Sequence, residues 1–281
     1  MVRLGRDPLR IGGFEFLWGS RTYVMGIINV TPDSFSGDGL TSVEAVVERA
    51  RRMESEGADL LDVGAESTRP ETWTGPGLSE AEEVARLLPA IEAISRAVRI
   101  PISVDTYKAS VARRAVLAGA RIVNDVFALR RDPEMASAVA EAGVPLIVMH
   151  NGSIPAGTDL LEGIAASLEE SVGLATRAGI DPAEVLIDPG IGFGKDREGN
   201  LEIVRRLPEL GRLGSPIAVG PSRKSFIGKT LDLPVEERLE GTAAIVALSI
   251  AGGADMVRVH DVRQMVRVAR MTDAVVRVPI S

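Results

Sequence analysis

The sequence predicts an α/β fold in which eight parallel strands, each followed by a helix, close into a (β/α)8 barrel, the TIM-barrel architecture. Short apolar runs typical of buried parallel strands alternate with amphipathic segments eight times in about 260 residues, without a linker. No G-x-G-x-x-G motif follows the first strand, which counts against an open, doubly wound dinucleotide-binding sheet. We therefore expect a single domain over residues 1–281.

A short β-hairpin should precede the barrel, over residues 9–19, because two apolar runs flank the turn-forming pair Gly12-Gly13. The first barrel strand is the apolar run 23–28, which stops at a polar residue, Asn29. A polar loop rich in turn formers leads to a segment with helical periodicity, 41–57, whose last residue is a glycine suited to a helix C-cap.

The remaining seven units repeat this pattern. Each predicted strand is a short apolar run that ends at a polar, glycine or proline residue: 60–63, 102–104, 122–123, 145–149, 185–187, 217–219 and 256–259. The predicted helices follow them, with apolar residues at helical spacing: 79–98, 107–118, 133–142, 160–178, 197–207, 235–251 and 262–276. The first of these helices has Glu82 and Glu83 in its first turns, where carboxylates interact favourably with the helix dipole.

Composition excludes several classes of protein. A net charge of −7 without a basic block makes nucleic acid an unexpected partner. The absence of cysteine excludes disulfides and thiolate metal sites. The N-terminus lacks a signal-peptide core, and the longest small-apolar stretch, 243–254, is too short to span a bilayer. We expect a soluble cytoplasmic protein that does not contact membranes.

Polar side chains gather where the predicted strands end. They are Asn29, Asp62, Asp105, Asn124, Asp125, His150, Asp188, Ser222, Arg223, Lys224, Arg258 and His260. Active sites of (β/α)8 barrels lie at the carboxyl ends of the strands, and both histidines of the chain fall there. Taken alone, Asp188 in its Asp-Pro-Gly context could simply cap a β-turn. The recurrence of the pattern favours a functional site.

Three short groups, Asp105, Asn124 and Asp188, should reach into the barrel, where two carboxylates and an amide could bind a flat, nitrogen-rich heterocycle. Internal capping or salt bridging is the alternative for each. Lys224 and Arg258 supply positive charge opposite these carboxylates, and a buried ion-pair network is the alternative there.

Arg258, His260 and Asn29 belong to strands eight and one, which are neighbours in a closed barrel. They could form a pocket for a phosphate or a metal-bound phosphate. The single amide oxygen of Asn29 suits a Mg²⁺ ion chelated by a substrate phosphate better than a metal cage made of protein alone. Whether His150 is structural or functional stays open.

Eight motifs in this order resemble those of the dihydropteroate synthase family. They are MGIINVTPDSFSGDG (25–39), DVGAESTRP (62–70), SVDTYKA (103–109), VND (123–125), VMHN (148–151), DPGIGFGK (188–195), GPSRKSFIG (220–228) and RVHD (258–261). The resemblance spans about residues 21–265 with consistent spacing, and the combination is specific although each motif alone is weak.

The resemblance implies a TIM-barrel transferase, usually a homodimer, that uses Mg²⁺ in folate biosynthesis. Members condense 6-hydroxymethyl-7,8-dihydropterin pyrophosphate with p-aminobenzoate to give 7,8-dihydropteroate, and sulfonamides compete with p-aminobenzoate. The last two helices are candidates for the dimer surface because they carry surplus apolar residues.

By the same resemblance, each matching position takes a role. Pterin binding falls to Asp105, Asn124, Asp188 and Lys224; pyrophosphate binding falls to Asn29, Arg258 and His260, with Asn29 also on the metal. The p-aminobenzoate side comprises Thr68, Arg69, Phe193, Ser222 and Lys224, and segments 31–39 and 65–70 match the two mobile loops. Catalysis rests on Lys224, Asp105, Asp188 and Arg258.

The chain departs from the family pattern at Ala65 and Glu71, where glycines are usual, and in the segment 151–159. These departures bear on loop conformation and sulfonamide affinity. Two rival functions are a pterin-binding methyltransferase on the same barrel and a non-catalytic binding paralogue. The first would not need the SRK motif or a diphosphate pocket, and the second is expected to lack Lys224, Asp105 or the TPDSFS loop, all of which are present.

Overall fold

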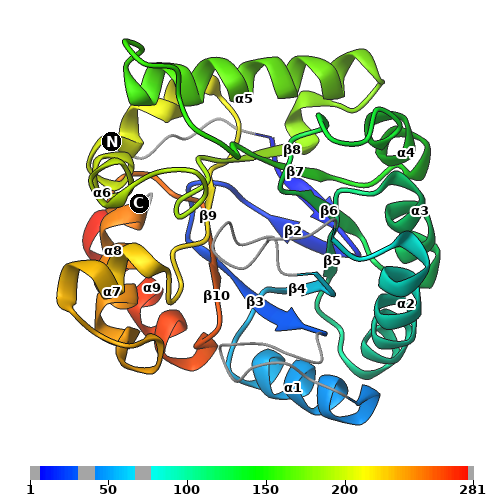
Figure 1. Ribbon diagram of the computed structural model, residues 1–281. Helices are drawn as coiled ribbons and strands as arrows, with labels where there is room; N and C mark the ends of the chain where they lie inside the picture. Colours follow the sequence, from blue (N-terminus) through cyan, green and yellow to red (C-terminus); the bar gives the residue numbers. More distant parts are fainter. Residues whose placement is uncertain (1–6, 31–41, 67–76, 278–281) are drawn as a thin grey trace.

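The computed structural model describes residues 7–30, 42–66 and 77–277. Eight parallel strands surround a central axis and the helices form a ring outside them (Figure 1). The barrel strands are β3 (Tyr23–Asn29), β4 (Leu60–Gly64), β5 (Ile102–Asp105), β6 (Ile122–Asp125), β7 (Leu146–Met149), β8 (Val185–Asp188), β9 (Ala218–Val219) and β10 (Met256–Val259). The helices are α1 (Val43–Ser55), α2 (Glu80–Ala97), α3 (Ala109–Ala118), α4 (Met135–Ala142), α5 (Leu160–Arg177), α6 (Arg197–Arg206), α7 (Ser225–Leu231), α8 (Leu239–Ala251) and α9 (Val262–Val276).

Each strand pairs with its neighbours in chain order, and the last strands return to the first. The order is β8-β7-β6-β5-β4-β3-β10-β9, all parallel. The ring closes between β8 and β9, where Ile187 forms a parallel bridge with Ile217 and donates its N–H to the carbonyl of Pro216 at 2.9 Å. The predicted (β/α)8 barrel is therefore confirmed, with β10 beside β3 as expected.

The N-terminal hairpin closes the bottom of the barrel. Its strands, β1 (Leu9–Ile11) and β2 (Phe14–Phe16), are antiparallel, as predicted. Their buried side chains form one cluster with the lowest inward-facing residues of the barrel strands: Leu9, Ile11, Phe16, Trp18, Tyr23, Met25, Leu60, Ile122, Ile147, Leu186, Ala218 and Met256. The Tyr23 ring lies 4.7 Å from Phe16 and 5.4 Å from Trp18, centroid to centroid. This apolar plug leaves the carboxyl ends of the strands as the end that carries polar groups.

Strand alternation separates apolar from polar side chains. On β5, Ile102 and Val104 pack in the core between strands and helices, whereas Asp105 reaches across the interior to Arg258 on β10. The same alternation places Val63 outward and Asp62 inward on β4. Gly64 lies beside Asp105, and a Cβ there would be 3.2 Å from the Cβ of that aspartate, so the glycine leaves room for it.

The region after β9 differs from the prediction. Helix α7 was not anticipated, because it is only seven residues long and ends at Asp232, which adopts a left-handed conformation. The predicted helix 235–251 is wrong at its start: Val235–Glu237 is a 3-10 turn, and α8 begins at Leu239. Arg238 interrupts the helix there because its side chain bonds the carbonyls of Leu233 and Arg223.

No helix in the described parts of the chain is long and apolar enough to cross a membrane. The other predicted helices lie within about two residues of their observed bounds. A 3-10 turn, Pro182–Glu184, precedes β8, and a 3-10 segment, Leu207–Leu213, follows α6.

Candidate active site

Arg258 lies at the centre of the barrel mouth, between two carboxylates. Its Nε donates to Asp62 Oδ2 at 2.5 Å and its Nη2 donates to Asp105 Oδ2 at 2.8 Å. Asp62 is completely buried, and its other oxygen has no hydrogen-bond partner among the described residues. Burial raises the pKa of Asp105 to about 7; Arg258 opposes this rise and the nearby Asp62 adds to it. Asp62 and Asp105 thus share one guanidinium in the interior.

Asn124 extends this network from β6, since its Nδ2 donates to Asp62 Oδ2 at 3.2 Å. Asp188, at the end of β8, is 8% exposed and accepts the N–H of Gly190 at 2.7 Å. Burial raises the pKa of Asp188 to about 6, while the Gly190 N–H and then the Lys224 charge act to lower it. The interior therefore presents a ring of carboxylate and amide oxygens at the mouths of β4, β5, β6 and β8.

The loop after β8 is shaped by glycines in left-handed conformations. Gly190 (φ 71°) lies so close to the carbonyl of His150 that a Cβ would be 1.8 Å from it. A Cβ on Gly192 (φ 83°) would lie 2.7 Å from Cδ of Lys224. The second glycine therefore makes space for the lysine stem, and both keep the loop folded against the neighbouring loops.

Lys195 ties this loop to the end of β7. Its ammonium contacts His150 Nδ1 at 2.7 Å and donates to the carbonyls of His150 and Gly190 at 3.1 and 3.0 Å. Burial, then the Lys195 charge, lower the pKa of His150 to about 4, so the imidazole is neutral and its Nδ1 is an acceptor. Burial lowers the pKa of Lys195 to about 7, which Asp188 opposes. His150, whose role the sequence left open, thus holds two loops together.

Lys224 and Phe193 meet from different loops. The ammonium of Lys224 lies 3.8 Å from the centroid of the Phe193 ring, a cation–π geometry. Phe193 packs with Val126 and Met149, so one wall of the mouth is apolar. A positive charge against an aromatic and aliphatic wall suits a ligand with a flat apolar body and a negative end.

Ser222 and His260 join the loops after the neighbouring strands β9 and β10. Ser222 Oγ accepts the N–H of His260 at 3.1 Å and lies 2.9 Å from its Nδ1, and both residues are buried. The His260 carbonyl also accepts from Arg49 on α1 at 3.2 Å. Asn29 ends β3, the strand next to β10, so it lies on the same side as expected.

The structure brings those of the predicted residues that it describes to one end of the barrel. Arg258 is bonded to the carboxylates Asp62 and Asp105, as its expected position opposite the interior carboxylates implied. Arg223 forms a bidentate ion pair with Asp261 and is not turned toward the carboxylates. Thr68, Arg69 and most of segments 31–39 and 65–70 lie outside the described residues.

Asp62 is the residue whose importance the sequence reasoning missed, although it stood among the polar strand ends. Its signal is the alternation in Leu60–Gly64, which turns an aspartate inward among apolar neighbours. Asp125, in contrast, has a structural role: its carboxylate accepts the N–H groups of Phe127 and Leu129 and so caps a turn. Asn124 and Asp125 are adjacent on β6, yet Asn124 bonds Asp62 in the interior and Asp125 caps the turn, because successive side chains of a strand face opposite sides.

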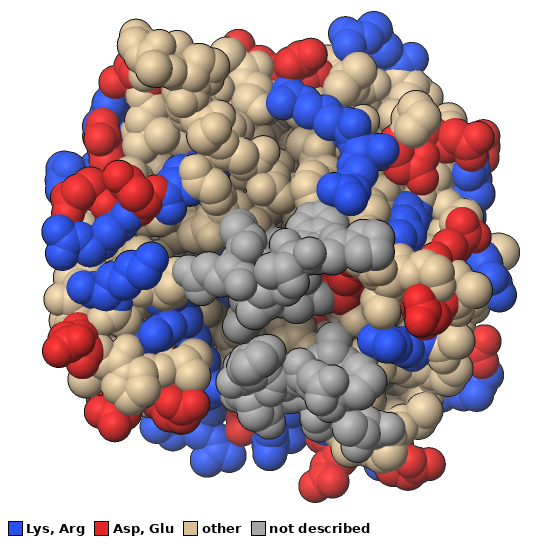
Figure 2. Space-filling model, in the orientation of Figure 1, with Lys and Arg blue, Asp and Glu red and all other residues tan. Residues whose placement is uncertain are grey.

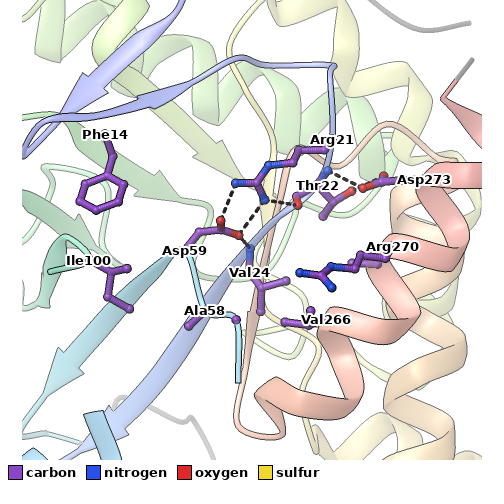
Figure 3. A pocket seen from close by; sticks show the side chains of 12 residues that line it. Phe14, Arg21, Thr22, Val24, Ala58, Asp59, Ile100, Val266, Arg270 and Asp273 are labelled. Carbon is purple, nitrogen blue, oxygen red and sulfur yellow. Dashed lines mark hydrogen bonds and ion pairs between the residues drawn. The ribbon is translucent and has the colours of Figure 1, made fainter. Parts of the chain in front are cut away.

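A cavity of about 550 Å³ lies at the other end of the barrel wall, beside the start of β3 and the C-terminal part of α9 (Figure 3). Arg21 pairs with Asp59 at 2.6 Å, and Asp273 accepts from Thr22. Arg270 also lines it. Its distance from the carboxyl ends of the strands, and the internal pairing of these charges, set it apart from the polar mouth.

The donors near Asn29 bear on a metal site. Among the described residues, no group of three or more histidine, aspartate and glutamate side chains is placed to hold a metal ion. Asn29 ends β3, the strand that pairs with β10, and its amide oxygen fits a divalent cation that brings most of its oxygen ligands from a bound diphosphate.

Comparisons with known proteins agree with this geometry. Residues 25–260 match the family model described as pterin binding enzyme. The chain is 49% identical to the dihydropteroate synthase of Bacillus subtilis over 255 residues, 90% of this chain and 88% of that one. Its fold is similar to that of a dihydropteroate synthase from Clostridium difficile crystallised with pteroic acid (TM-score 0.88, 44% identity, 93% and 99% of the chains). It is also similar to that of the Xanthomonas albilineans enzyme with 4-aminobenzoic acid (TM-score 0.89, 42% identity, 98% and 100%).

Proposed function

Because this chain belongs to the dihydropteroate synthase family of pterin-binding enzymes, we propose how its own residues divide the work of that reaction. It is a transferase that condenses 6-hydroxymethyl-7,8-dihydropterin pyrophosphate with p-aminobenzoate, and it releases pyrophosphate and 7,8-dihydropteroate. The observation that carries the proposal is the ring of buried carboxylates and an amide around Arg258 at the carboxyl ends of the strands.

The pterin binds in the interior. A pterin ring presents several N–H donors along one edge, and Asp188, Asp105 and Asn124 offer acceptors on separate strands. Charge-assisted hydrogen bonds to carboxylates are about twice as strong as neutral ones. When the ring arrives, Arg258 can exchange one carboxylate contact for the ligand, since it is shared between Asp62 and Asp105.

The diphosphate binds nearer the surface, at Asn29, Arg258 and His260. When bound, Mg²⁺ would neutralise charge on the departing pyrophosphate, with Asn29 supplying one protein oxygen. His260 is held in place by Ser222, so its contact with the phosphate is preorganised. Figure 2 shows lysine and arginine side chains interspersed with aspartate and glutamate around this face.

The p-aminobenzoate binds along the apolar wall. Phe193 contacts its ring, while Lys224 and Ser222 lie toward its charged and polar ends. Thr68 and Arg69 complete this side in the proposal. Sulfonamides, which compete with p-aminobenzoate in the family, should occupy the same wall.

We propose a dissociative order of bond events. The aromatic amine is a weak nucleophile, and the residues on its side are cationic, hydroxyl-bearing or apolar, so none of them is suited to act as a general base. Cleavage of the C–O bond is therefore driven from the leaving group, held by Arg258, His260 and Asn29. Asp105 and Asp188, in their ionised forms at the mouths of β5 and β8, stabilise the pterin methylene cation that remains.

An isotope experiment tests this order. Substrate with ¹⁸O in the bridging position is incubated with enzyme and Mg²⁺ but without p-aminobenzoate. Cleavage followed by return should scramble the label into non-bridging positions of the same phosphate. If neither scrambling nor pyrophosphate release occurs until p-aminobenzoate is added, a concerted displacement becomes the better account.

The chain is also proposed to act as a homodimer through α8 and α9. Among the described residues both helices carry exposed apolar side chains toward their C-terminal ends: Leu248 is 57% exposed, Met271 66% and Val275 70%. Such a surface is costly to leave in water and suits a second copy of the chain. A cytoplasmic location stays a prediction from the sequence.

Charge placed on this surface should split the dimer. Leu248→Glu combined with Met271→Glu is expected to halve the mass measured by sedimentation velocity, because two carboxylates would be buried without partners. Leu117→Glu is the matched control, since that leucine is 88% exposed on α3. An unchanged mass in the double variant would place the interface elsewhere.

A further inference from the structure

The loops after β9 and β10 are joined by two contacts between consecutive residues of each loop. Ser222 Oγ binds the backbone N–H and ring of His260 at 3.1 and 2.9 Å. One residue further along both loops, Arg223 donates Nε and Nη2 to the two carboxylate oxygens of Asp261, at 3.0 and 2.7 Å. Both members of this ion pair are about four-fifths buried. The two loops therefore behave as one unit.

The backbone of Arg223 is held in a strained conformation. Its φ of 56° lies in the left-handed region, which residues other than glycine rarely adopt. The N–H of Arg223 donates to the buried Thr242 Oγ1 at 3.0 Å, and its carbonyl accepts from Arg238 at 3.1 Å. Gly228 leaves room for that arginine, because a Cβ there would lie 2.4 Å from its guanidinium. Strain of this kind persists only where the surroundings over-determine it.

This reversal of the chain sends the neighbours of Arg223 to different partners. Ser222 holds His260, which belongs to the phosphate side of the site, and Lys224 lies over the Phe193 ring on the p-aminobenzoate side. A change in the backbone at residue 223 would therefore move both ends of the site together.

From this geometry we infer that Arg223 and Asp261 are positioning residues that couple the phosphate side of the site, at His260, to Lys224. The inference rests on the function given above, and assigns these two residues no contact with the reacting atoms. This coupling would keep the leaving group and the incoming amine aligned with each other. Alignment matters because misplacement by about 1 Å can cost about 10²-fold in rate.

A double-mutant cycle tests whether Asp261 acts through Lys224. Asp261→Asn keeps the size of the side chain and removes its charge, and it should lower kcat/KM at least tenfold in the wild-type background. In the Lys224→Ala background the same change should lower it less than threefold, with melting temperatures within a few degrees throughout. The inference would be overturned if Asp261→Asn lowered kcat/KM by the same factor in both backgrounds, or if Asp261→Asn had the wild-type rate.

A second pair of variants separates the backbone from the ion pair. Arg223→Gly and Arg223→Ala both lose the ion pair, but glycine adopts positive φ without strain. The glycine variant should be at least fivefold more active than the alanine variant and still below wild type. Equal activities would show that the backbone conformation is not what matters, and wild-type activity in the glycine variant would remove the ion pair from the account.

Binding of inorganic pyrophosphate with Mg²⁺, measured by calorimetry, gives a readout that needs no turnover. Asp261→Asn should weaken it at least threefold because His260 loses its fixed position. Arg263→Ala is the control: Arg263 is exposed on α9 and pairs with Glu56, the residue that follows α1, so affinity should not change. Unchanged affinity in Asp261→Asn contradicts the coupling, whereas a wild-type chain that binds pyrophosphate but does not form dihydropteroate contradicts the function.

Discussion

Lys224→Arg should lower kcat/KM by about 10³-fold while leaving the fold intact. Lysine is a compact charge on a flexible stem, whereas arginine is a planar fork that needs more room. Here the ammonium lies 3.8 Å from the Phe193 ring, and the stem passes Gly192, where even one added methyl group would lie 2.7 Å from it. A guanidinium cannot occupy this space without moving Phe193 or the loop after β8.

The measurement is steady-state condensation with both substrates varied, together with a thermal melt. Lys229→Arg, on the exposed side of α7 in the same loop, is the matched control and should retain wild-type kinetics. Near-normal turnover in Lys224→Arg would show that Lys224 is a structural cation.

Asp188→Asn should abolish measurable pterin binding, a loss of at least 10²-fold in affinity. The amide keeps the shape and can still accept the Gly190 N–H, but it lacks the charge that strengthens hydrogen bonds from the ring. Hydrogen bonds to a charged group contribute roughly 1.5–3 kcal/mol each. Calorimetry with a pterin is the test, with Asp181→Asn, exposed at the opposite end of β8, as control. Affinity within twofold of wild type would remove Asp188 from the site.

The same variant should stabilise the ligand-free enzyme above pH 6. Burial raises the folded-state pKa of Asp188 to about 6, above its unfolded value, so the folded state binds more protons between about pH 4 and 6. Stability therefore falls as pH rises through that window, by up to about 3 kcal/mol for a shift of this size. The melting temperature of Asp188→Asn should exceed that of wild type by several degrees at pH 8, and the two should converge near pH 4. Identical melting curves at pH 8 would show that the ionised carboxylate does not destabilise the ligand-free enzyme.

Local patterns were enough to predict the barrel and the end of it that carries the site. Apolar runs ending at Asn29, Asp105 and Asp188 mark strands and their carboxyl ends whatever the rest of the chain does. The hairpin also followed from its Gly12-Gly13 turn. Its task of plugging the barrel could not be predicted, because that depends on side chains from every barrel strand meeting at one point.

Which site residues contact one another could be learned only from the three-dimensional structure. Arg258 and Asp62 are far apart in the sequence and meet only because the barrel closes β10 onto β3 and β4. Inward and outward faces decide that Asp62 joins the site while Asp125 caps a turn. Arg223 follows the same strand end as Lys224, but its backbone is left-handed and its side chain pairs with Asp261, which the sequence alone does not predict.

The central claim, that this chain is a dihydropteroate synthase, is tested most directly by following pyrophosphate release with each substrate added alone and both together. The account predicts fast release only when 6-hydroxymethyl-7,8-dihydropterin pyrophosphate, p-aminobenzoate and Mg²⁺ are all present, with one 7,8-dihydropteroate formed per pyrophosphate. Methyl transfer from a methyl-folate to a corrinoid protein without pyrophosphate chemistry, or binding of both substrates without turnover, would contradict it.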